Sequence, residues 1–199
     1  MAVIDYGIGN LRSAEKALCR AGADARLVTT AAEVGAADAV VLPGVGNFGR
    51  CSSELAASGM WEAAEQAAGS GRPFLGICVG MQLLYQGSEE SPGVPGLGLF
   101  EGRVSMLAEG VRRPQMQWNL LEVTRPGSVL FAGCSEGAWA YFVHSYRAPV
   151  GPETVATCDY GGTVAAAVEA GPLWATQFHP EKSSALGLAL LANFVRSCA

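Results

Sequence analysis

Apolar runs alternate with segments of helical periodicity through the first 85 residues of the chain. Asn10 is a suitable N-cap for a helix that extends to about Arg20, amphipathic spacing predicts a second helix over about Ser52–Ala68, and Val79–Tyr85 predicts a short third one. Strands that alternate with helices indicate right-handed βαβ units and a parallel sheet covered on both faces. The expected strands are Ala2–Tyr6, Ala25–Thr29, Ala39–Leu42 and Phe74–Ile77.

The pattern changes after residue 85. Gln86–Gly98 is rich in Gly, Pro, Ser and Glu and predicts a loop, and the chain from Leu99 to about Val168 is strand-like with frequent turn residues. A closing helix over about Ser184–Arg196 returns to the α/β pattern. We therefore expect one α/β domain over residues 1–199, with a mostly parallel central sheet flanked by helices and an antiparallel extension. The expected antiparallel strands are Val104–Leu107, Leu120–Val123, Ala138–Val143 and Val155–Cys158.

Composition excludes several classes of protein. Half of the 199 residues are apolar and 16% are charged, which is opposite to a disordered composition. The net charge of −5 and the absence of a basic run argue against nucleic acid as a partner. The apolar stretch Ala185–Val195 contains Asn193 and is shorter than the ~18 residues of a membrane span. The first residues have no basic segment typical of a signal peptide, so we expect a cytoplasmic protein without membrane association.

Histidine is scarce and cysteine is plentiful. The chain has two histidines, His144 and His179, six cysteines and no Cys-x-x-Cys motif, so we expect no metal site and no cofactor. Gly7-Ile8-Gly9 suggests a dinucleotide-binding loop, but Arg12 stands where that motif needs glycine, and we reject this interpretation. Any chemistry must therefore come from the protein's own side chains.

Gly76-Ile77-Cys78-Val79-Gly80 stands where a predicted strand meets a predicted helix. This is the arrangement of a nucleophile elbow, in which small flanking residues allow a tight turn that presents one side chain. A helix N-terminus favours the thiolate of Cys78, and the Val79 N–H points toward a developing oxyanion. The alternative is a buried structural cysteine between two turn glycines.

His179 is the better candidate for a base. Residues i and i+2 of an extended segment share a face, so Glu181 can approach the His179 imidazole and fix its tautomer. The alternative for His-Pro-Glu is a loop with a surface ion pair. His144 has no carboxylate near it in sequence and is interpreted as a hydrogen-bonded histidine at a strand end. Leu42–Gly46 can form an anion-binding nest, although such a segment is more often a plain turn.

The motifs together identify a family. The chain resembles the class I, triad-type glutamine amidotransferases, which have a flavodoxin-like fold, and among them the glutaminase subunits of imidazole glycerol phosphate synthase. The resemblance covers essentially the whole chain. It rests on segments 4–11, 42–48, 76–84, 142–146 and 177–183, which include Gly-Ile-Cys-Val-Gly-Met-Gln, Phe-Val-His-Ser-Tyr and Gln-Phe-His-Pro-Glu-Lys-Ser.

The resemblance implies roles for individual residues. Cys78 is the expected nucleophile, His179 the general base and acid, and Glu181 the residue that orients it. Backbone N–H groups of Val79 and Val45 are expected to bind the oxyanion, the latter after a peptide reorientation. The residues expected to hold L-glutamine are Gly46, Gln82, Ser145 and Tyr146.

The resemblance also implies a heterodimer with a (β/α)₈-barrel cyclase. Ammonia passes through a tunnel to this partner and joins a phosphoribulosyl-formimino nucleotide, giving imidazole glycerol phosphate and an aminoimidazole carboxamide ribotide. Asn10 and Lys182 fall at the expected interface, where the alternative for Lys182 is a solvated lysine. The family usually has His and Gly at Gln115 and Gln117, so docking, gating or the acceptor could differ here. Two other functions stay open: the glutaminase of another class I amidotransferase, and a catalytically silent regulatory subunit.

Overall fold

An eight-stranded sheet organises the molecule. The computed structural model describes residues 1–134 and 137–198. The sheet has the order β2-β1-β3-β4-β12-β11-β10-β7, parallel from β2 to β12 and antiparallel from β12 to β7. The parallel strands are β1 (Ala2–Ile4), β2 (Arg26–Val28), β3 (Val40–Gly44), β4 (Phe74–Cys78) and β12 (Leu173–Thr176); the antiparallel ones are β7 (Glu122–Val123), β10 (Thr154–Asp159) and β11 (Thr163–Ala170). The expected fold class is confirmed.

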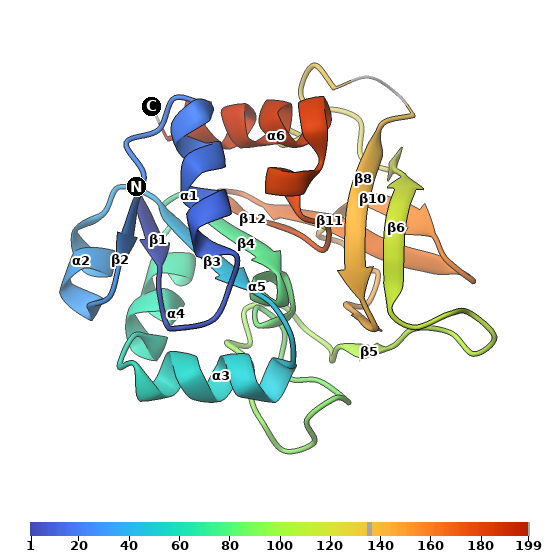
Figure 1. Ribbon diagram of the computed structural model, residues 1–199, viewed down its shortest axis with the longest axis horizontal. Coiled ribbons are helices and arrows are strands. Elements are labelled where there is room, and N and C mark those ends of the chain that lie inside the picture. Colours follow the sequence, from blue (N-terminus) through green and yellow to red (C-terminus); the bar gives the residue numbers. More distant parts are fainter. Residues whose placement is uncertain (135–136, 199) are drawn as a thin grey trace.

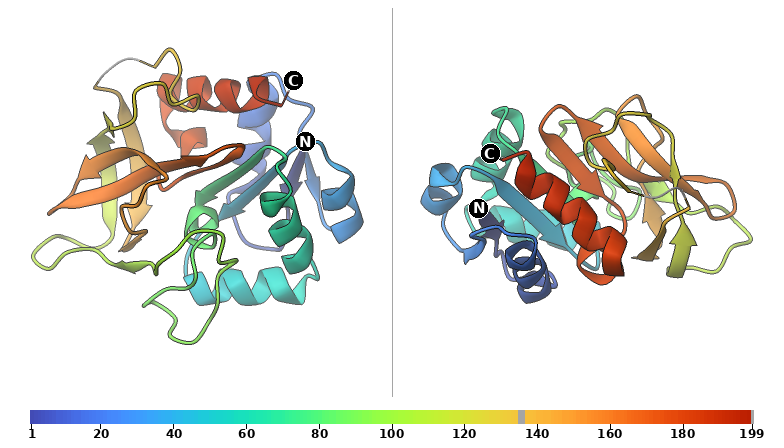
Figure 2. Two further views of the ribbon diagram at one scale, coloured as in Figure 1. Left: turned by 180° about the vertical axis from the view of Figure 1, so that it is seen from behind. Right: turned by 90° about the horizontal axis from the view of Figure 1, so that it is seen from above.

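Helices cover both faces of the parallel part. Figures 1 and 2 show α1 (Leu11–Arg20) and α6 (Ser184–Arg196) on one face and α2 (Ala31–Ala36), α3 (Phe48–Ala57) and α4 (Trp61–Gly69) on the other. Strands β3 and β4 are buried along their whole length, which agrees with continuous apolar runs covered on two sides. The core therefore fixes the carboxyl ends of β3, β4 and β12, which are neighbours in the sheet.

Two short antiparallel ribbons extend the fold. Strand β5 (Ser105–Met106) pairs with β9 (Tyr146–Arg147), and β6 (Gln115–Leu120) pairs with β8 (Trp139–His144). The β6/β8 ribbon lies beyond the parallel strands, at the right of Figure 1. Its last residue, His144, leads directly into the segment that carries Ser145 and Tyr146.

The single helix predicted over residues 52–68 is wrong. Two helices, α3 and α4, meet at Gly59, whose φ of +72° lies in the left-handed region that ends a helix. Met60 is nevertheless fully buried, as the amphipathic spacing indicates.

The helix predicted after Asn10 is confirmed, but the Asn10 side chain makes no capping hydrogen bond. The helix predicted from Val79 to Tyr85 ends at Gln82, as α5 (Val79–Gln82).

The strand predicted over Leu120–Val123 is also wrong. Leu120 ends β6 in the ribbon, whereas Glu122 and Val123 form β7 at the edge of the main sheet. The rest of β6 was not predicted because its buried position holds a glutamine, Gln115, while Met116 and Trp118 are exposed. In the part of the chain that the structure describes, no helix is long and apolar enough to cross a membrane.

Candidate active site

The chain makes a tight, strained turn at Cys78. This residue ends β4 and precedes α5 with φ 56° and ψ −110°, a conformation that costs an L-residue on the order of 1–3 kcal/mol. A Cβ on Gly80 would lie 1.8 Å from the Leu42 carbonyl oxygen, and one on Gly76 would lie 2.9 Å from the Gly80 oxygen. Both glycines are therefore required by close backbone approach. The predicted elbow is present, although α5 has four residues and its dipole contributes little.

His179 and Glu181 form a buried pair. Nδ1 of His179 and Oε1 of Glu181 are 2.8 Å apart, and both side chains are 2% exposed. Glu181 lies in the 3₁₀ turn η1 (Pro180–Lys182), which directly follows His179. Burial opposes protonation of His179, but interactions with the Cys78 thiol and the Glu181 carboxylate outweigh it and raise the pKa of His179 to about 10. Nε2 of His179 has no hydrogen-bond partner among the residues that the structure describes, so it is free to contact a substrate.

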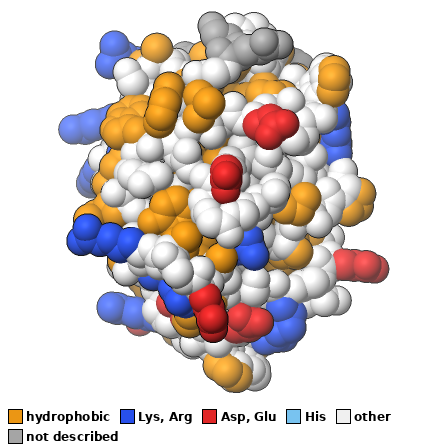
Figure 3. All heavy atoms as spheres, turned by 90° about the vertical axis from the view of Figure 1, so that its right-hand side faces the viewer, with side chains coloured by type: hydrophobic (Ala, Val, Ile, Leu, Met, Phe, Trp, Pro, Cys, Tyr) orange, Lys and Arg blue, Asp and Glu red, His pale blue; other side chains and the backbone are white. Residues whose placement is uncertain are grey.

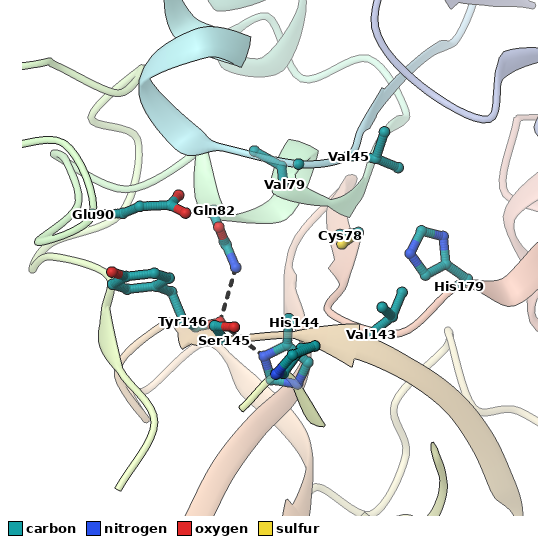
Figure 4. A pocket seen from close by; sticks show the side chains of 12 residues that line it. Val45, Cys78, Val79, Gln82, Glu90, Val143, His144, Ser145, Tyr146 and His179 are labelled. Carbon is teal, nitrogen blue, oxygen red and sulfur yellow. Dashed lines mark hydrogen bonds between the residues drawn. The ribbon is translucent and has the colours of Figure 1, made fainter. Parts of the chain in front are cut away.

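Cys78, His179 and the predicted oxyanion and substrate residues line one cavity of about 250 Å³, whereas Glu181 lies behind His179, bonded to its Nδ1. Figure 4 shows Cys78 facing His179 across this cavity, with Gln82 and Glu90 on the other side of the sulfur. The volume suits a molecule of amino-acid size, since pockets for larger ligands have roughly 300–1,000 Å³. The lining residues are Val45, Gly46, Cys78, Val79, Gln82, Glu90, Pro114, Val143, His144, Ser145, Tyr146 and His179.

The topology explains why residues distant in sequence meet here. Val45 follows β3, Cys78 ends β4, and His179 follows β12, so all three stand at the carboxyl ends of adjacent parallel strands. Ligands of open α/β sheets bind at this edge because loops from neighbouring strands converge there. Part of the remaining wall comes from the end of β8, which brings Ser145 and Tyr146 to the cavity.

Two buried side chains hold the loop that carries Val45. The Tyr6 hydroxyl donates to the Pro43 carbonyl at 2.8 Å, and Cys51 Sγ donates to the Val45 carbonyl at 3.3 Å. Burial raises the pKa of both groups, so each stays protonated and remains a donor. The loop therefore keeps Val45 and Gly46 at the cavity wall beside Cys78.

His144 differs from His179 although it lines the same cavity. Its Nδ1 lies 2.8 Å from the Tyr146 carbonyl oxygen, and because a carbonyl can only accept, Nδ1 carries the hydrogen. Burial lowers the pKa of His144 to about 4, and the nearby His179 adds to this effect. The interpretation of His144 as a hydrogen-bonded histidine at a strand end is confirmed.

Two predicted interface residues lie outside the cavity. Asn10 is half-buried before α1, where its carbonyl accepts from the Ser13 and Ala14 N–H groups, and Lys182 is exposed at the end of η1. The two Gln residues that depart from the family pattern both lie on β6 but differ in burial: Gln115 is fully buried opposite His144, and Gln117 is exposed. No cluster of metal-ligating side chains occurs within residues 1–134 and 137–198.

Sequence reasoning missed Glu90 as a cavity residue. Its Oε2 accepts a hydrogen bond of 2.7 Å from the Phe48 N–H at the first residue of α3. The loop around Glu90 has no periodicity, so no sequence signal distinguishes Glu90 from Glu89.

Gln177 was also missed as a residue near the nucleophile. It is fully buried, and its Nε2 lies 3.7 Å from Cys78 Sγ. Its spacing of two residues before His179 is a signal that could have found it.

Comparisons with known proteins give the family. Residues 2–198 match the family model described as glutamine amidotransferase class-I. The chain is 51% identical over 200 residues to the imidazole glycerol phosphate synthase subunit HisH of Synechococcus sp. (strain JA-3-3Ab), covering 98% of this chain and 92% of that protein. It is 51% identical over 201 residues to the HisH subunit of Deinococcus radiodurans, covering 99% and 93%.

A solved structure supports the fold. A crystal structure described as glutamine amidotransferase superposes with a TM-score of 0.77 at 22% identity and covers 99% of this chain and 98% of that one. At this identity the likeness concerns the fold alone. Together with the full-length sequence matches, it confirms the resemblance drawn from the motifs. The chain is a class I glutamine amidotransferase and belongs to the HisH family, the glutaminase subunits of imidazole glycerol phosphate synthase.

Proposed function

We propose that this chain hydrolyses glutamine to glutamate and ammonia with Cys78, His179 and Glu181, and supplies the ammonia to a cyclase in histidine biosynthesis. One observation carries the proposal. A cysteine on a strained elbow faces a histidine with a free Nε2 across one cavity of amino-acid size. Glu181 occupies the other ring nitrogen of that histidine and stabilises the imidazolium.

The geometry supports a double-displacement reaction. Cys78 Sγ attacks the side-chain amide carbon of glutamine, and the carbonyl electrons move onto oxygen, where the Val79 and Val45 N–H groups can bind the oxyanion. As the tetrahedral species collapses, the C–N bond breaks and His179 Nε2 gives its proton to the departing ammonia. The product of this step is a glutamyl thioester on Cys78.

Water completes the turnover. His179, now neutral, takes a proton from a water molecule that attacks the thioester carbon. The C–S bond breaks, glutamate leaves, and the proton on His179 restores the starting pair. Glu181 stays bonded to Nδ1 and keeps the ring in the orientation that points Nε2 at the reacting atoms.

The opposite end of the cavity suits the amino-acid part of the substrate. Glu90 is a carboxylate on this wall and can accept from the α-ammonium group of glutamine. Gly46, Gln82, Ser145 and Tyr146 supply backbone and amide groups around the same end. This arrangement holds the side-chain amide toward Cys78.

An exposed apolar surface supports the proposed (β/α)₈-barrel partner. The outer face of the β6/β8 ribbon carries Met116, Trp118, Leu120 and Trp139. Each of these side chains is between 44% and 61% exposed. Figure 3 shows hydrophobic side chains on this side of the molecule. The same face continues to Val143, which lines the cavity. A partner on this face would meet the cavity and receive ammonia before it is protonated in water.

The decisive substitution is Cys78→Ala. We expect the complex with a barrel cyclase to lose glutamine-dependent synthesis while ammonia-dependent synthesis continues, because the cyclase does not need the nucleophile. Glutamate release and imidazole glycerol phosphate formation are measured in parallel, with and without the cyclase. Glutaminase turnover that persists in the variant contradicts the role of Cys78, and no glutamate release by the wild-type complex indicates a silent subunit.

A further inference from the structure

Two buried glutamine side chains connect the cavity wall to the nucleophile. Gln82 lies at the end of α5 and lines the cavity. Gln177 follows β12, is fully buried and does not line the cavity. The main-chain N–H of Gln177 donates to the Ala166 carbonyl at 2.8 Å, which fixes this residue to β11. Gln177 lies in the same connection between β12 and η1 as His179 but has no part in the reaction described above.

A backbone carbonyl sets the orientation of both amides. Gln82 Nε2 lies 3.0 Å from the Tyr146 carbonyl oxygen, and only a donor can face a carbonyl, so the Gln82 amide cannot be reversed. Figure 4 shows this bond together with that of His144 to the same oxygen. The same Gln82 Nε2 lies 3.0 Å from Gln177 Oε1, which must therefore be the acceptor.

The orientation of Gln177 follows. Since its Oε1 accepts from Gln82, its Nε2 carries the donors, and this atom lies 3.7 Å from Cys78 Sγ. A directed N–H donor therefore faces the sulfur from a buried residue that does not line the cavity. A hydrogen bond of this kind favours negative charge on sulfur and restricts the side-chain rotation of Cys78.

We propose that Gln177 is a positioning residue that holds Cys78 Sγ through Nε2 and the substrate-facing Gln82 through Oε1. This inference rests on the proposed function and deepens it, because it links the substrate wall to the nucleophile by a continuous chain of hydrogen bonds. The chain runs from the Tyr146 carbonyl through Gln82 and Gln177 to Cys78. The Gln177 side chain touches no substrate in this account and acts through these two residues.

The two ends of the Gln177 amide can be tested separately. Gln177→Glu keeps the size and an acceptor for Gln82 but places a carboxylate oxygen near Sγ in place of the donor. Gln177→Leu removes both interactions. Gln66→Leu is the matched control, because Gln66 is exposed on α4, away from the cavity. Folding of each variant is checked by its circular dichroism spectrum and thermal transition.

The first readout is alkylation of Cys78 by iodoacetamide at neutral pH, followed by mass spectrometry of the peptide that contains it. We expect Gln177→Glu and Gln177→Leu to react about 10- to 100-fold more slowly than wild type, the range for a lost hydrogen bond to a charged group. The other groups near Cys78, namely Tyr6, Cys51 and His179, are unchanged in these variants. Wild-type alkylation rates in both folded variants would overturn the proposal.

The second readout is glutaminase kinetics in the complex with the cyclase. Both variants are expected to lose kcat, whereas the KM for glutamine is expected to rise more in Gln177→Leu, where Gln82 loses its acceptor, than in Gln177→Glu. A purely structural role for Gln177 predicts equal changes in the two variants and would also overturn the proposal. The alkylation result is independent of turnover, so it can succeed or fail even if the wild-type complex releases no glutamate.

Discussion

Both histidines line one cavity, and their surroundings drive them to different charge states. His179 follows β12 and meets the Glu181 carboxylate at 2.8 Å, which helps to raise its pKa to about 10. His144 ends β8, donates to a neutral carbonyl, and has its pKa lowered to about 4 by burial. Burial is common to both, so the difference comes from the partner on Nδ1 and from the neighbouring thiol.

This comparison explains why one histidine suits proton transfer and the other suits structure. The imidazolium of His179 has a proton available on Nε2 for a leaving group. The neutral His144 holds the Tyr146 carbonyl, to which Gln82 also donates. His144 therefore helps to hold the cavity wall that carries Gln82 and Tyr146. The following predictions separate this structural role from the proton transfer proposed for His179.

The largest expected effect is that of His179→Asn. Loss of the proposed general acid and base is expected to lower kcat for glutamine hydrolysis by about 10²–10⁴-fold. The matched variant His144→Asn retains a donor for the Tyr146 carbonyl and is expected to change kcat less than tenfold. Glutamate release by the complex with the cyclase measures both. A larger loss in His144→Asn than in His179→Asn would reverse the assignment.

A smaller effect is expected for Glu181→Gln. The amide keeps a hydrogen-bond partner for His179 Nδ1 but removes the negative charge, so the pKa of His179 should fall. A decrease of one to two pKa units destabilises the imidazolium by about 1.4–2.7 kcal/mol and should move the alkaline limb of the kcat profile to lower pH by one to two units. The pH–rate profile of the complex tests this, with Glu65→Gln on the exposed face of α4 as control. An unchanged profile would show that the charge of Glu181 is unimportant.

The third effect concerns stability rather than rate. The pKa of His144 is lowered from 6.5 to about 4 on folding, so between these values the unfolded chain binds more protons than the folded one. Stability is therefore lost as pH falls from 6.5 to 4, by about 3 kcal/mol for this group. Urea unfolding at pH 7 and pH 4.5 should show a smaller loss for His144→Asn than for wild type. Equal losses would mean that His144 is not held neutral.

The sequence predicted local structure best at positions where the backbone geometry permits only a few residue types. The glycines on both sides of Cys78 predicted the elbow, since close approach of Leu42 and Gly80 leaves no room for a Cβ. The spacing of His179 and Glu181 predicted their pairing, but the extended segment expected between them is a 3₁₀ turn, η1, which brings the carboxylate to Nδ1 instead.

Other features depend on contacts that no local pattern encodes. Glu90 comes from an irregular loop, and its place in the cavity depends on the hydrogen bond to the start of α3. The β6 strand was not recognised because it buries a glutamine and exposes apolar residues, a pattern opposite to that of an ordinary surface strand. The roles assigned to Asn10 and Lys182 stay predictions, because both depend on a partner.

The most direct test of this account is a nuclear magnetic resonance titration of the two histidine rings between pH 4 and pH 10. The account predicts that the His179 ring stays protonated from acidic pH to above pH 8, and that the His144 ring stays neutral down to about pH 5. Substitution of each histidine in turn assigns the signals. Two rings that both titrate near pH 6.5, or a neutral His179 beside a charged His144, would contradict it.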